Sequence, residues 1–152
     1  MNEQLVYKFF DDDDFLRISN KIKEVELSTA GEIRVSIRER RKFSERKKNI
    51  NEIAEKEFFR LGMDKTRDKT GILIFFLLKE RQFHILADKG ISDKVDPRTW
   101  NSIKDEMQKK FIMGEFLNGI LYGIEEVGKH LSKFFPIKPN DKDELSNRIV
   151  IN

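Results

Sequence analysis

The stretch "GILIFFLL", residues 71–78, carries seven apolar side chains behind a single glycine and no polar one. A strand with one solvated face alternates apolar and polar residues, whereas a strand covered on both faces is apolar throughout. The run is also far shorter than the roughly 20 residues that a membrane-spanning helix needs. We therefore expect a central strand here, and the rest of the chain must cover both of its faces.

Two more strands are expected beside this one. "KERQ" turns the chain into "FHILAD", residues 83–88, which we expect to pair with the central strand as a hairpin. Upstream, "STAGEIRVSIRER" places Ile33, Val35 and Ile37 in alternation with polar residues. This alternation is typical of a strand with one face in water. We predict an edge strand for this segment.

Apolar residues at three- and four-residue spacing predict helices around the strands. The first spans residues 13–27 and follows a run of aspartates, which suits the positive end of a helix. A second is expected to begin at the cap Ser44 and to end at Gly62. Asp96 followed by Pro97 starts a third, because Asp can accept free backbone N–H groups and Pro lacks one.

Gly114 separates this third helix from a last one, which stops before Pro136. The expected order is helix, strand, helix, strand, strand, helix, helix. A helix between the first two strands predicts a right-handed parallel crossover, and the hairpin makes the third strand antiparallel. We predict an α/β (α+β-like) fold, in which a small mixed sheet of three to four strands is flanked by helices.

The length of 152 residues fits one domain. We expect that domain over residues 1–136 and a flexible tail over 137–152, where periodicity is lost. The absence of cysteine excludes disulfides, thiolate metal sites and a cysteine nucleophile. The N-terminal residues form neither a basic leader nor a long apolar stretch, so we expect a cytoplasmic protein without a transmembrane segment.

The sequence "DKGISDKVDP", residues 88–97, gathers oxygen-bearing side chains around one glycine. Asp88, Asp93 and Asp96 could surround Ca²⁺ or Mg²⁺, because both ions prefer oxygen ligands. Asp64 and Asp68 precede the central strand and could come near the same end of the sheet. A purely structural interpretation stays open, in which Asp96 caps a helix, Asp88 ends a strand and Asp93 sits in a turn.

A basic segment, "RERRKFSERKK" at residues 38–48, contains seven basic and two acidic residues. Such a segment can neutralise the phosphates of nucleic acid or of an anionic lipid surface. A charge run at a junction between a strand and a helix is more often a solvated face, with Phe43 packed ahead of the helix cap. We favour the solvated face, and nucleic acid is the minority interpretation.

Four segments, in this order along the chain, resemble the TPM domain family, which is named from thylakoid, photosystem and membrane-associated relatives and is often labelled phosphatase-like. They are "TAGEIRVSI", "LGMDKTRDKTGILIFF", "DKGISDKVDP" and "MQKKFIMGEFLNGILYGIEEVG". The resemblance covers about residues 15–135 and implies a small mixed sheet flanked by helices. Relatives are usually secreted or membrane-tethered. Because we expect neither a leader nor an anchoring helix in this sequence, it resembles a soluble single-domain branch of the family.

Some TPM relatives bind divalent cations, and the resemblance adds weight to a metal site formed by the aspartates of the polar loop. The family's loop commonly reads Gly-x-Gly before its carboxylates, and here Asp88 takes the place of the first glycine. Phosphoester hydrolysis is implied by the family label alone, since no phosphate-cradling P-loop occurs. We expect a non-catalytic interaction module that binds Ca²⁺ or Mg²⁺ and docks a partner such as a membrane-anchored relative; the alternative is a weak metal-dependent phosphomonoesterase.

Overall fold

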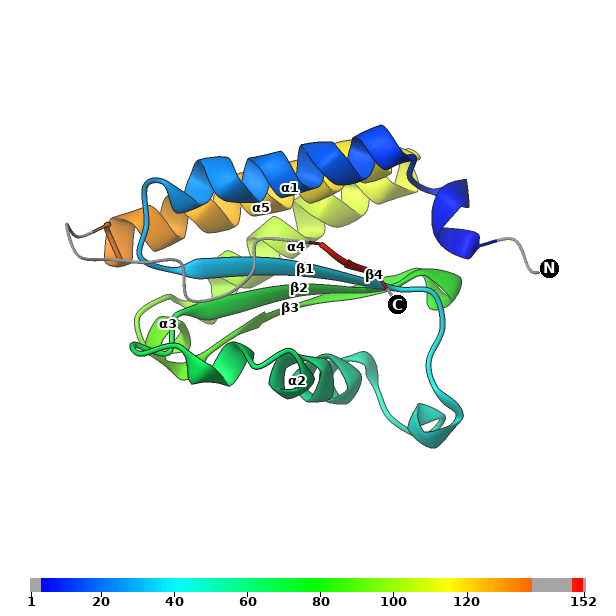
Figure 1. The fold of residues 1–152 in the computed structure, drawn as a ribbon, viewed down its shortest axis with the longest axis horizontal. Coiled ribbons are helices and arrows are strands. Elements are labelled where there is room, and N and C mark those ends of the chain that lie inside the picture. The colour runs from blue at the N-terminus through cyan, green and yellow to red at the C-terminus, as the bar shows by residue number, and fades with distance from the viewer. Residues whose placement is uncertain (1–3, 138–148, 152) are drawn as a thin grey trace.

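A four-stranded mixed sheet lies between helices on both of its faces (Figure 1). The computed structural model describes residues 4–137 and 149–151. The strands are β1 (Glu32–Arg38), β2 (Gly71–Leu77), β3 (Gln82–Ala87) and β4 (Val150–Ile151), in the spatial order β3-β2-β1-β4. The long helices are α1 (Asp12–Glu26), α2 (Ile50–Arg60), α4 (Pro97–Ile112) and α5 (Phe116–Phe134). Short helical turns are η1 (Leu5–Lys8), η2 (Phe43–Glu45), η3 (Met63–Lys65), η4 (Leu78–Glu80) and α3 (Lys89–Ser92).

The central position of β2 confirms the prediction made from its unbroken apolar run. All of its residues are buried, and it pairs in parallel with β1 and antiparallel with β3. The helix α2 makes the crossover between β1 and β2, and η4 makes the turn of the hairpin. The predicted mixed α/β fold is therefore confirmed, with four strands.

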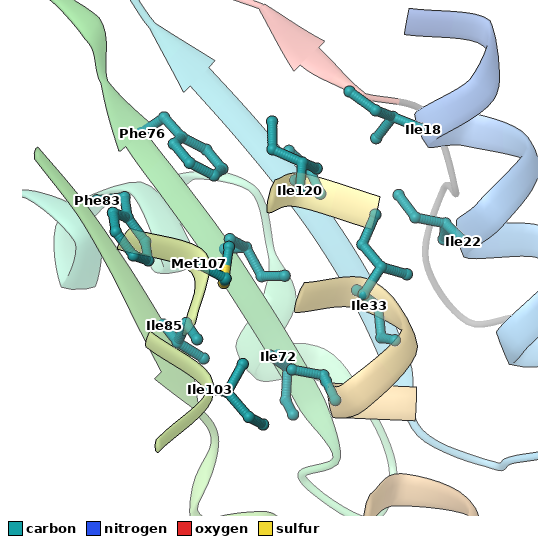
Figure 2. Close-up of a cluster of buried hydrophobic side chains, with 14 of the residues drawn as sticks. Ile18, Ile22, Ile33, Ile72, Phe76, Phe83, Ile85, Ile103, Met107 and Ile120 are labelled. Atoms are coloured by element: carbon teal, nitrogen blue, oxygen red, sulfur yellow. The ribbon is translucent and has the colours of Figure 1, made fainter. Parts of the chain in front are cut away.

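Successive residues of β2 supply the cores of the two helical layers, because neighbouring side chains of a strand point to opposite faces. Ile72, Ile74 and Phe76 belong to the larger core, which α1, α4 and α5 cover. Figure 2 shows the side chains of those helices lying over the strand residues in this core. Leu73 and Phe75 belong to the smaller core beneath α2. Burying each such side chain contributes about 1.5–3 kcal/mol relative to leaving it in water.

Glycines allow α5 to lie close against α4. A Cβ built at Gly119 would stand 2.3 Å from the Phe111 ring of α4, and one at Gly123 would stand 2.6 Å from the Met107 sulfur. At distances this short, no side chain larger than the hydrogen of glycine fits at either position. The small residues near the start of α5 thus set how closely it packs on α4.

Helix starts follow the expected chemistry except in one case. Asp96 caps α4 by accepting a 2.9 Å hydrogen bond from the Arg98 backbone N–H, as predicted. The prediction that Ser44 caps the second helix is wrong, because Ser44 lies within η2 and α2 begins at Ile50. The cap is Asn49, whose side chain accepts from the Glu52 N–H in a reciprocal capping box.

The prediction of β1 as an edge strand with a wet face is also wrong. β4 pairs with its outer side at Ser36 and Ile37, so β1 is internal. Its polar side chains face α2, and Ser36 and Arg38 are buried there. Alternation of apolar and polar residues indicated the two faces correctly, but the polar face is covered by a helix that carries matching charges.

The C-terminal segment reaches the sheet through β4. The predicted flexible tail, residues 137–152, falls mostly on residues 138–148 and 152, which lie outside the described residues. Within its described end, Ile149 packs against the larger core, and Val150 and Ile151 extend the sheet. Among the described helices, none combines the length and the apolar character that crossing a membrane requires.

Candidate functional site

Within the two predicted polar loops, residues 63–70 and 88–97, the segments 64–70 and 88–96 carry the predicted aspartate ligands and meet at one end of the sheet. The first leads into β2 and the second follows β3, and these strands are antiparallel neighbours. The Asp88 backbone N–H donates a 2.9 Å hydrogen bond to the Gly71 carbonyl, which fixes the two junctions to each other. The expectation that the two loops lie at the same sheet end is thereby met.

Gly90 forms the tightest contact between the loops. A Cβ at this position would lie 2.2 Å from the carbonyl oxygen of Asp68 and 2.5 Å from that of Lys69. Real Cβ atoms do not approach backbone oxygens so closely, so the contact requires glycine. The loop glycine is therefore explained by packing of α3 on the other loop.

A cavity of about 440 Å³ opens beside this contact. Asp68 and Asp93 both line it, one from each loop. The remaining lining residues are Ala30, Arg67, Thr70, Gly90, Lys94, Phe134, Phe135 and Pro136. The structure thus brings two of the five predicted ligands to one cavity, together with two basic residues.

Asp88 has one satisfied and one unsatisfied carboxylate oxygen. It is the N-cap of α3, and its Oδ1 accepts a 2.7 Å hydrogen bond from the Lys89 N–H. Its Oδ2 is buried and has no hydrogen-bond partner among the described residues. Such oxygens are rare in folded proteins, because losing water without a replacement partner costs about 1–3 kcal/mol.

Two of the other predicted ligands, Asp96 and Asp68, pair with arginines. Both carboxylate oxygens of Asp96 accept from the Arg98 guanidinium, and these hydrogen bonds, with one from the Arg98 backbone, lower the pKa of Asp96. Asp68 pairs with Arg67 at 3.0 Å. Asp64 lies in η3, where its backbone carbonyl accepts from the Lys69 ammonium. Asp96 therefore acts as the helix cap of the structural interpretation.

A different carboxylate cluster lies at the start of α1. Oxygens of Asp11, Asp13 and Asp14 lie within 4.8 Å of one another, a grouping that could hold a metal ion. Within the described part of the chain it is the one such group of three, and the five loop aspartates form none. Asp11 and Asp14 also make a capping box, and Asp13 pairs with Arg17.

Sequence reasoning missed a buried ionic network under the sheet. Glu57 of α2 accepts hydrogen bonds from Ser36, Arg38 and Arg60. Burial opposes its ionisation, but the hydrogen bonds and the charges of the two arginines outweigh burial and lower the pKa of Glu57 to about 2. One signal was available: Glu57 interrupts the apolar face formed by Ile53, Ala54 and Phe58.

The chain belongs to the TPM domain family, since the family model for the TPM domain matches residues 7–130. The BA42 protein from the psychrophilic bacterium Bizionia argentinensis has a similar structure, with a TM-score of 0.85 and 33% identity, covering 95% of this chain and 96% of that one. The N-terminal domain of the cg2496 protein from Corynebacterium glutamicum shares the fold, with a TM-score of 0.60 and 14% identity over 80% of this chain and 74% of that one. No curated protein matches the chain.

Proposed function

We propose that this TPM domain is a non-catalytic binding module that takes up Ca²⁺ or Mg²⁺ between the loops 64–70 and 88–96. The observation that carries the proposal is the buried Oδ2 of Asp88, which lacks a partner among the described residues. A cation would satisfy this oxygen, as hydrogen bonds satisfy the other one. Asp68 and Asp93, which line the neighbouring cavity, would supply further carboxylate ligands.

The donor chemistry fits a hard cation, but the ligands are not gathered in advance. Asp68 and Asp93 are exposed, so their side chains can turn toward Asp88. Asp68 would exchange its pairing with Arg67 for the cation. Because binding must reorder these side chains, we expect weak affinity, with a dissociation constant of about 10⁻⁴–10⁻³ M.

The non-catalytic part of the proposal rests on side-chain geometry. In the described chain, neither His84 nor His130 is hydrogen-bonded to a serine or threonine, and neither lines the cavity between the loops. A hydroxyl nucleophile needs an adjacent base within hydrogen-bonding distance. The alternative function, a metal-dependent phosphomonoesterase, would have to use the bound cation to activate water.

The test is a titration with Ca²⁺ and with Mg²⁺, followed by backbone amide NMR. We expect saturable shifts at residues 68 and 88–93. Asp88→Asn or Asp93→Ala should weaken the affinity for the cation about tenfold. Asp105→Ala, an exposed aspartate of α4, is the control and should leave the titration unchanged. Shifts centred instead on Asp11, Asp13 and Asp14 would reject the loop site.

Hydrolysis of a generic phosphomonoester separates module from enzyme. Activity that disappears both with a chelator and in Asp93→Ala would favour the phosphomonoesterase.

The partner in our proposal is a protein such as a membrane-anchored relative, in keeping with the membrane association of other TPM proteins. Capture of that relative only in the presence of the cation would link docking to the loop site.

A further inference from the structure

A second polar cavity, of about 330 Å³, lies at the carboxyl end of β1. Its lining residues are Arg38, Glu39, Arg40, Lys42 and Arg60. In Figure 1, β1 runs from the end that carries α3 to the end where the chain turns toward η2, so this cavity is remote from the polar loops. The two cavities therefore lie at opposite ends of the sheet, and four of the five residues that line this one are basic.

Some of the charges around this cavity are neutralised within the fold. Arg38, only 5% exposed, donates to Glu45 at 2.6 Å and to Glu57 at 3.1 Å. Arg60 also pairs with Glu57. The carboxylate of Glu39 accepts a 2.7 Å hydrogen bond from the Val6 N–H. Glu45 and Glu57 are thus paired with arginines, whereas Glu39, which also lines the cavity, has a backbone N–H as its partner and no ion pair in the described chain.

Three hydrogen-bond donors remain for a ligand. The Nε of Arg38 is buried and has no partner in the described chain, although both other nitrogens of its guanidinium are bonded. The side chains of Arg40 and Lys42 are exposed and make no ion pair with the described residues. A buried donor without a partner and two cations without an ion pair line the same cavity, an arrangement suited to an oxyanion.

We propose that this cavity binds the phosphoryl group of a small phosphorylated molecule. A phosphoryl group has three acceptor oxygens, which matches donors that come from the strand (Arg38) and from the segment after it (Arg40, Lys42). The cavity volume is at the lower end of those that hold small ligands, which are about 300–1,000 Å³. A nucleic acid would need a longer basic stripe than these residues form. The next basic residue of the segment, Arg46, lies outside the cavity, with its guanidinium over the Phe43 ring at 4.4 Å.

The experiment compares two double variants with equal loss of charge. Inorganic phosphate and pyrophosphate are titrated into the protein at constant ionic strength, and the amide shifts of residues 38–42 and 57–60 are followed. We expect saturable binding that Arg40→Ala with Lys42→Ala weakens by about tenfold or more. Arg46→Ala with Lys47→Ala, in the same segment but outside the cavity, should change the affinity by less than about twofold.

Three results would overturn the proposal. The first is equal weakening by both double variants, which would indicate a diffuse basic surface. The second is tighter binding of a single-stranded oligonucleotide or an anionic vesicle that depends equally on both pairs of residues, which would assign the segment to a polymer or a membrane. The third is acetate binding as strong as phosphate binding at the same ionic strength. Because none of these measurements uses Ca²⁺ or the loop aspartates, failure here leaves the cation proposal to its own test.

Discussion

The hydroxyl of Ser36 in β1 donates a 2.8 Å hydrogen bond to the carboxylate of Glu57 in α2, and both residues are buried. Arg38, two residues along the strand, donates to the same carboxylate at 3.1 Å. The polar face of β1 is thus joined to the helix by charge-assisted hydrogen bonds. A helix with an entirely apolar face would leave these strand groups unpaired, at a large cost in free energy.

Replacing Glu57 by Gln should destabilise the fold strongly. The substitution keeps the shape of the side chain but leaves the buried Arg38 with one carboxylate partner, Glu45, in place of two. Removing one member of a buried ion pair costs about 3–5 kcal/mol, and the exposed Arg60 lessens that cost, so we expect a loss of about 2–4 kcal/mol. Urea unfolding at neutral pH measures the difference.

The pH dependence of stability provides a second readout of this site. The pKa of Glu57 is lowered from 4.5 to about 2 in the folded protein, so the unfolded state binds the proton more tightly. Its contribution, on the order of 3 kcal/mol, is present above pH 4.5 and is lost as the pH falls from there through 2. The wild type should therefore lose its advantage over Glu57→Gln in that window. A difference that stays constant from neutral pH to pH 2 would contradict the assigned ionic network.

Gly90→Ala should disturb the contact between the two polar loops. Its Cβ would collide with backbone carbonyls, which cannot rotate away as a side chain can. We expect a loss of about 1–3 kcal/mol and displaced amide signals at residues 66–71. Gly114→Ala is the control: its φ of +80° also disfavours alanine, but nothing lies within 4 Å of its Cβ, so residues 66–71 should be unaffected. Unchanged signals there in Gly90→Ala would contradict the close contact.

Much of the fold could be predicted because its strongest signals are local. The apolar run of β2 and the Asp96–Pro97 start of α4 each depend on neighbouring residues, and both were placed correctly. The position of β1 depends on β4, more than a hundred residues later in the chain, and on charges supplied by α2. Periodicity reports which residues share a face, but it does not report what covers that face.

The candidate sites also combine features that the sequence predicts with features that depend on the folded structure. Strand order allowed the loops around Asp68 and Asp93 to be placed at one end of the sheet. The pairing of Asp96 with Arg98 and the orphan oxygen of Asp88 depend on side-chain geometry that spacing does not give. The cavity at the carboxyl end of β1 was not predicted, because one of its lining residues, Arg60, comes from α2 and lies outside the basic segment 38–48.

The packing of α5 on α4 can be tested by comparing two glycines. Gly119→Ala would bring a Cβ to 2.3 Å from the Phe111 ring, and Gly123→Ala would bring one to 2.6 Å from the Met107 sulfur. Phe111 has a rigid ring that meets Phe83 edge to face and stacks on Phe116, whereas a methionine can adopt another rotamer. We expect Gly119→Ala to cost about 2–3 kcal/mol and Gly123→Ala about 1 kcal/mol or less. Equal losses in thermal or urea unfolding would show that rigidity of the neighbour does not decide the cost.

Asp88→Asn should separate the stability of the domain from cation binding. Asn caps helices about as well as Asp, so the hydrogen bond to the Lys89 N–H can persist. The substitution removes the negative charge and puts a neutral amide NH2 in place of the buried oxygen that lacks a partner. Burying an unpaired neutral amide costs less than burying an unpaired carboxylate oxygen. Without divalent cations the variant should therefore be as stable as the wild type or more stable by up to about 1 kcal/mol. In millimolar Ca²⁺ the wild type should gain more stability than the variant, because a cation that binds the folded state more tightly raises the free energy of unfolding further. Thermal unfolding of both proteins, with Ca²⁺ and with a chelator, gives the four values needed. A variant that loses stability in the chelator would show that the Asp88 carboxylate stabilises the fold without a cation. A variant that gains as much stability as the wild type from Ca²⁺ would show that this carboxylate is not a ligand.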